Sequence, residues 1–186
     1  MNYKYLKNIK DHINNKGITN NSEIELGNLT LSGSSLAQEE LPENGRLVIN
    51  NIPFELILNK KFDNIKMNGE EIIINEKNIK SIYMLACAIH GDISENIIIE
   101  TSKERLSWEL IILDTIHPID KNTPHCFAMD SMNTQNGKSN LLKPKLSVYE
   151  FQFSDKKNNI KKFVLPFNPF GHIFAITLLI GVDKNV

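Results

Sequence analysis

Two side chains that could transfer protons, His90 and Asp92, follow a stretch of apolar residues near the middle of the chain. Residues 82–89 are apolar apart from the Tyr83 hydroxyl, and Gly91 separates the imidazole from the carboxylate. A histidine titrates near neutrality and can act as a general base when a carboxylate lies beside it. The pattern predicts either a ligand-binding or catalytic pair at a strand end, or a simple turn with a half-exposed histidine.

Trp108 is the only tryptophan, and it lies between Ser107 and Glu109 in an otherwise apolar segment. An indole in this position either packs in the core or presents a platform for the apolar face of a sugar ring. Successive side chains of a strand point to opposite faces. Glu109 is therefore expected to share no site with Trp108 in a regular strand.

A third group of polar residues lies in the segment 114–145, which has no regular hydrophobic period. A connection of this length in a compact domain is often functional. Its histidines and carboxylates match no compact zinc motif, so polar loop residues are the default interpretation; they are His117, His125, Asp114, Asp120 and Asp130. The predicted ligand-binding set is therefore His90, Asp92, Trp108 and His125.

Short strands must position these residues, because apolar residues alternate with polar ones and no long helical period occurs. The run 79–89 and the closing run 171–180 are apolar on both faces, which is typical of central strands. His172, inside the closing run, is expected to be a core histidine. Further strands are predicted at 23–31, 46–49, 54–58, 64–67, 71–75, 96–101, 105–113, 147–153 and 160–165. The fold class is all-β, as a two-sheet antiparallel jelly-roll β-sandwich.

With 186 residues the chain is expected to form a single β-sandwich domain over residues 1–186. Residues 1–12 are polar and weakly patterned, which suggests a flexible N-terminal lead. Residues 114–145 form the long loop region.

Charge and composition exclude several classes of partner. The net charge of −1 argues against binding to nucleic acid or an anionic membrane surface. The sequence has no secretory leader and no phosphate-binding loop, so we expect a cytoplasmic protein. Cys87 and Cys126 lie among apolar residues, as buried reduced thiols or as a disulfide between strands.

Several segments, in order along the chain, resemble one bacterial family: 11–18, 51–54, 62–65, 82–92 and 165–178. They are similar to the galactose-binding-like, jelly-roll accessory β-sandwich domain of bacterial glycoside hydrolases such as α-mannosidases and α-fucosidases. The family has Ser-Asp-Trp on the strand after the central one, where this chain has Ser107-Trp108-Glu109. The resemblance implies a carbohydrate-associated β-sandwich of a family whose members are mostly not catalytic.

Three functions follow as hypotheses. The first is a stand-alone module that binds a saccharide or similar polyhydroxylated ligand at the rim, through His90, Asp92, Trp108 and His125. The second is a small enzyme of specialised metabolism, in which His90, Asp92 and His125 perform acid–base chemistry in a cyclisation or hydrolysis. The third is a protein-interaction domain. No cofactor is required, although Asn14, Asn15 and loop carboxylates could supply oxygen ligands to a structural Ca²⁺.

Overall fold

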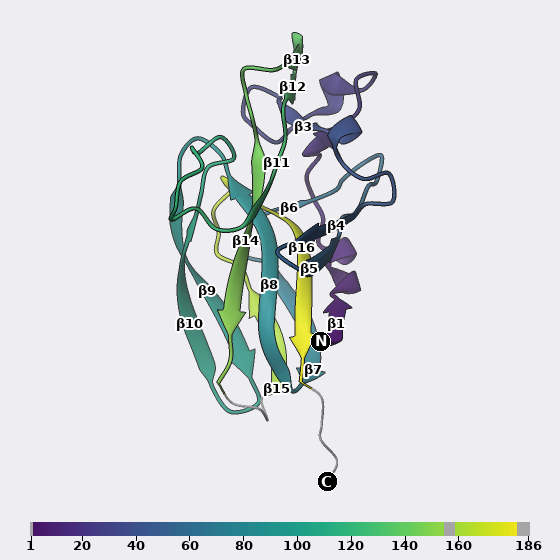
Figure 1. The fold of residues 1–186 in the computed structure, drawn as a ribbon. Coiled ribbons are helices and arrows are strands. Elements are labelled where there is room, and N and C mark those ends of the chain that lie inside the picture. The colour runs from purple at the N-terminus through teal and green to yellow at the C-terminus, as the bar shows by residue number, and fades with distance from the viewer. Residues whose placement is uncertain (1, 155–158, 182–186) are drawn as a thin grey trace.

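The computed structural model describes residues 2–154 and 159–181, and they form a β-sandwich. Two large sheets are stacked face to face, with a small sheet and a hairpin packed at one end and side (Figure 1). The predicted β-sandwich is therefore confirmed, while its jelly-roll assignment stays a prediction.

The first large sheet is built around β8, as the apolar run 79–89 predicts. Its strand order is β1-β16-β8-β14-β11, with β6 paired to β16, and all these pairs are antiparallel. The bounds are Asn2–Tyr5 (β1), Ile65–Lys66 (β6), Ile79–Ala88 (β8), Cys126–Ala128 (β11), Lys145–Gln152 (β14) and Gly171–Ile180 (β16).

The second large sheet has the order β10-β9-β15-β7, also antiparallel. Its strands are Glu71–Lys77 (β7), Ile93–Thr101 (β9), Arg105–Ile112 (β10) and Asn159–Val164 (β15). The β9–β10 hairpin keeps one register from Ile93 opposite Ile112 to Glu100 opposite Arg105, so the chain returns to the end of β8 when β10 ends.

Smaller elements complete the molecule. A four-stranded sheet contains β2 (Ile18–Thr19), β3 (Ser35–Ala37), β12 (Met132–Thr134) and β13 (Gly137–Ser139), and a hairpin contains β4 (Arg46–Ile49) and β5 (Ile52–Glu55). The turn of this hairpin uses two adjacent left-handed residues, Asn50 and Asn51, as two-residue hairpin turns require. Three short 3₁₀ helices are η1 (Lys7–Asp11), η2 (Ile24–Leu26) and η3 (Gln38–Glu40).

Three expectations from the sequence differ from the structure. The alternating segment 23–31 does not form a strand. It is a loop that contains η2 and a turn. Residues 2–11 are not a free lead, since β1 pairs with β16 and η1 follows. The region 114–145 also contains the short strands β11, β12 and β13.

The two faces of β8 bury different cores. Ile82, Met84 and Ala86 face the second large sheet, whereas Leu85 and Cys87 face the small sheet and the β4–β5 hairpin. A strand that is covered on both sides needs an uninterrupted apolar sequence. This explains why the middle of the chain shows no polar alternation.

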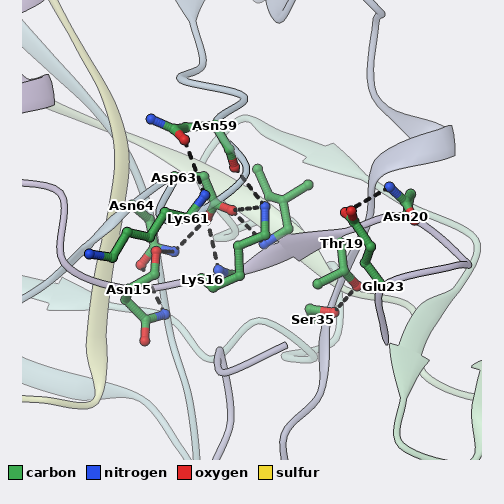
Figure 2. Close-up of polar contacts among 12 residues, drawn as sticks. Asn15, Lys16, Thr19, Asn20, Glu23, Ser35, Asn59, Lys61, Asp63 and Asn64 are labelled. Atoms are coloured by element: carbon green, nitrogen blue, oxygen red, sulfur yellow. Dashed lines mark hydrogen bonds and ion pairs between the residues drawn. The ribbon is translucent and has the colours of Figure 1, made fainter. Parts of the chain in front are cut away.

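A buried carboxylate joins the N-terminal segment to the chain before β6. Asp63 is fully buried and lies 3.0 Å from the Lys16 ammonium, which also donates to the Asn59 carbonyl (Figure 2). Its oxygens accept the N–H groups of Gly17 at 2.8 Å and Ile18 at 3.1 Å. Burial raises the pKa of Asp63, against the opposing effects of Asn64 and Lys16.

His172 is buried as expected, and it is neutral. Its Nδ1 lies 2.9 Å from Asn64 Oδ1, and the Asn64 amide nitrogen already donates to Asp63 and to the Asn15 carbonyl. Nδ1 therefore carries the proton, and the described residues give Nε2 no hydrogen-bond partner. Burial lowers the pKa of His172 from 6.5 to about 3.

We expect Asp63→Ala to lower the free energy of unfolding by about 3–5 kcal/mol, because it leaves Lys16 charged and unpaired inside the protein. Urea unfolding at neutral pH measures this loss. Asp11→Ala removes an exposed carboxylate and should cost no more than about 0.5 kcal/mol. Equal losses in the two variants would contradict a structural role for the Asp63 ion pair.

The His172 imidazole predicts a pH dependence of stability. The unfolded chain takes up a proton near pH 6.5, whereas folded His172 does so only near pH 3. The contribution of neutral His172 to the free energy of unfolding is therefore complete above pH 6.5. It is lost as the pH falls, by about 2 kcal/mol at pH 5. Urea unfolding of the wild type and His172→Asn across this range measures the difference; Asn can donate to Asn64 but does not titrate. Parallel pH profiles would rule out this assignment.

Candidate functional site

The structure places His90 at the end of β8, where the sequence analysis expects it, but the side chain does not pair with Asp92. His90 is exposed, and its backbone is left-handed, with φ of 63°. Its Nε2 accepts the N–H of Leu31 at 3.3 Å, and its ring lies edge-on to Phe170. The imidazole therefore contacts neighbouring loops rather than a carboxylate.

Asp92 instead contacts the chain that follows β10. It accepts the N–H of Asp114 at 2.7 Å and lies 3.2 Å from His117 Nδ1. Asp114 in turn accepts the N–H groups of Gly91 at 2.5 Å and Ile116 at 2.9 Å. We call residues 90–92 together with 113–117 the Asp92 rim. Its two carboxylates hold two loops together.

The Asp92–His117 pair has the geometry of an oriented imidazole. A carboxylate at Nδ1 fixes the ring and leaves Nε2 as the nitrogen that can exchange a proton. Both side chains are about one-third exposed, at 32% for His117 and 36% for Asp92. The sequence analysis named His117 only as a loop residue. The signal that could have identified it is the tight β9–β10 hairpin, whose continuous pairing places Ile112 opposite Ile93 and so returns the chain to Asp92.

Trp108 lies away from the Asp92 rim. It pairs with Ile97 in the middle of the β9–β10 hairpin, so about 13 Å of strand separates it from the Ile93 end. Its half-buried ring is edge-on to Phe151 and Phe153 of the opposite sheet, with ring centroids 5.7 and 5.6 Å away. Glu109 is exposed, as the opposite face of the strand requires.

Trp108 lines a pocket of about 190 Å³ between the β9–β10 turn and the end of β14. We call it the Trp108 pocket. Its walls combine apolar rings with hydroxyl, amide and charged groups; the lining residues are Thr101, Ser102, Lys103, Glu104, Leu106, Trp108, Gln152, Phe153, Ser154 and Asn159. An apolar surface with a few polar groups is the usual composition of a small-molecule site.

His125 stands apart from both places. It precedes β11, its side chain is exposed, and its carbonyl accepts the Val148 N–H at 2.7 Å. Within residues 2–154 and 159–181 its imidazole has no hydrogen bond. The four predicted residues are thus divided: His90 and Asp92 lie at one end, Trp108 lies along β10, and His125 lies beside β14.

Tyr149 supports the Asp92 rim from below. Its hydroxyl oxygen accepts the N–H of Leu113 at 2.8 Å, and burial raises its pKa to about 12. The phenol is therefore neutral and serves as a fixed anchor for the start of the 113–117 loop.

The described residues contain no group of three or more His, Cys, Asp or Glu side chains placed to hold a metal ion. The side chains of Asn14 and Asn15, suggested as Ca²⁺ ligands, are engaged in hydrogen bonds to Lys66, Glu70 and Asn64. The nearest buried carboxylate, Asp63, already holds the Lys16 ammonium. A structural Ca²⁺ stays a prediction from the sequence.

The two cysteines are free thiols, and they are not bonded to each other. Cys87 is buried, and burial raises its pKa to about 12. Burial also raises the pKa of the half-buried Cys126. Both thiols are therefore protonated at neutral pH.

Residues 6–181 match the model of the AziU2-like beta-sandwich domain family, so the chain belongs to that family. No curated protein matches the sequence. Among solved structures, the chain is similar to the Podospora anserina GH26-CBM35 β-(1,4)-mannanase, with 11% sequence identity and a TM-score of 0.26. That match covers 81% of this chain and 28% of the mannanase, so the chain spans under a third of that protein's length. No described helix is long and apolar enough to cross a bilayer.

Asp92→Ala should release the 113–117 loop, because it removes the acceptor of the Asp114 N–H and of His117. We expect amide exchange at Asp114 to accelerate at least tenfold, with a stability loss of about 1–2 kcal/mol. Hydrogen–deuterium exchange and urea unfolding measure these effects. The control is Asp130→Ala, since the Asp130 side chain is 97% exposed. Unchanged exchange at Asp114 would show that Asp92 does not hold the loop.

Proposed function

We propose that this AziU2-like β-sandwich domain binds a small polyhydroxylated ligand of the saccharide type in the Trp108 pocket. The observation that supports it is the indole itself, which lines a pocket whose other walls carry amide, hydroxyl and carboxylate groups. Sugar rings offer an apolar face to an aromatic ring and hydroxyl groups to polar neighbours. The resemblance to accessory modules of glycoside hydrolases favours a sugar among such ligands.

The polar walls suit hydroxyl groups because each hydroxyl both donates and accepts. Gln152 and Asn159 can supply amide donors and acceptors from opposite sheets, and Glu104 can accept. The pocket is smaller than the roughly 300–1,000 Å³ of drug-sized sites. We therefore expect one sugar unit to bind, and to bind weakly.

The pocket can be tested directly because Trp108 is the only tryptophan in the chain. Titration with methyl glycosides of mannose, galactose, glucose and fucose should shift its fluorescence emission for at least one of them. Trp108→Ala and Gln152→Ala should each lower the affinity for that sugar at least tenfold, as measured by calorimetry. Glu109→Gln changes the neighbouring residue on the opposite face of β10 and should leave affinity unchanged. No spectral change with any sugar at saturating concentration would refute the proposal.

A second candidate is an acid–base enzyme, which the sequence analysis assigns to His90, Asp92 and His125. The Asp92–His117 pair, at 3.2 Å, favours His117 as the proton-transferring group in place of the other two histidines. The two functions differ in which variants matter. His117→Ala would abolish turnover by an enzyme of this kind, and it would leave sugar binding at the Trp108 pocket unchanged.

A further inference from the structure

Lys145, the first residue of β14, is a lysine inside the protein. Only 2% of its surface is exposed, whereas lysine is almost never fully buried unless it is paired. Its backbone is fixed on both sides by Thr115: the Lys145 N–H donates to the Thr115 carbonyl at 2.8 Å, and the Thr115 hydroxyl donates to the Lys145 carbonyl at 3.2 Å. The Lys145 side chain therefore extends from a strand whose backbone is hydrogen-bonded to the Asp92 rim.

The acidic groups around Lys145 are engaged elsewhere. Asp92 and Asp114 both attract the ammonium, but their oxygens accept backbone N–H groups and His117. In the described part of the chain, the Lys145 amine makes no hydrogen bond and no ion pair. Lys16 shows the contrast, because its ammonium has both Asp63 and the Asn59 carbonyl.

Burial lowers the pKa of Lys145, although Cys126, Asp114, Asp92 and Cys87 act in the opposite direction. The nearby thiols are not competing nucleophiles. Cys126 lies opposite Ser147 on the neighbouring strand, and both it and Cys87 have raised pKa values. Burial thus shifts the amine toward its reactive, uncharged form and shifts both thiols away from their reactive thiolate form.

We propose that Lys145 is a carbonyl-reactive amine that condenses with the aldehyde group of a small molecule at the Asp92 rim. The nitrogen lone pair attacks the carbonyl carbon, a C–N bond forms, and the carbonyl oxygen takes up a proton to give a carbinolamine. Loss of water from that adduct then forms a C=N bond, so amine and aldehyde yield imine and water. This site is separate from the Trp108 pocket, and the inference does not rest on the proposed sugar binding.

Reductive trapping tests the inference on the wild-type chain. The protein is treated with substoichiometric glycolaldehyde and sodium cyanoborohydride at about pH 7, and mass spectrometry of Glu-C peptides gives the labelling rate at each lysine. Lys143, two residues away and with 68% of its side chain exposed, is the matched control. We expect Lys145 to be labelled several-fold faster than Lys143. The ratio should shrink toward pH 10, where ordinary lysines also lose their proton.

Lys145→Gln should remove this fast label, and Lys143→Gln should keep it, with thermal melting as the check on folding. If Lys145→Gln fails to fold, the wild-type ratio of the two rates still decides the question. Labelling of Lys145 at or below the rate of Lys143 would overturn the inference. Saturation of the Trp108 pocket with a bound sugar should leave the ratio unchanged, so the two proposals can fail independently.

Discussion

The buried ion pair of Asp63 and Lys16 is the contact on which the rest of the fold depends. The carboxylate accepts the N–H groups of Gly17 and Ile18 immediately before and within β2, and the adjoining Asn64 contacts both Asn15 and His172. Asp63 and Asn64 together therefore join the N-terminal segment, the chain entering β6 and the central strand β16. Because the residues of this polar network are buried, its hydrogen bonds specify one arrangement of these segments.

The β8 strand sets a second constraint, because it is covered on both faces. From Ile82 to Ala88 the strand is apolar apart from the Tyr83 hydroxyl, and after its end the chain enters the Asp92 rim. Trp108 lies away from that rim, because it pairs with Ile97 halfway along the β9–β10 hairpin. The domain thus separates its two chemically distinct places: oriented titratable groups at one end, and an aromatic pocket toward the other.

Much of the fold could be predicted from the sequence, because it depends on local patterns. The apolar runs of β8 and β16, the Asn50–Asn51 turn and the β9–β10 hairpin all follow from residue type and spacing. The segment 23–31 is a loop although it alternates, because its apolar residues do not share one buried face: Leu29 is buried, whereas Leu26 and Leu31 are exposed.

The site could be predicted only in part, because its contacts join distant segments. Sequence proximity suggested a pair between His90 and Asp92, whereas the hydrogen bonds connect Asp92 with His117, 25 residues later. Lys145 carried no signal at all: a lysine that begins an apolar strand looks like a solvated end residue. Only its burial and its contacts with Thr115 of the 113–117 loop show that it is enclosed.

Strand β14 runs from the Asp92 rim to the Trp108 pocket. Lys145 begins it, and Gln152, in the wall of the Trp108 pocket, ends it seven residues later. An extended strand of that length spans about 23 Å, and β14 is paired with β8 from Ser147 to Gln152. The distance between the two places is therefore set by backbone geometry rather than by loop conformation, and a chain-like molecule reaching both would need a contour of at least that length.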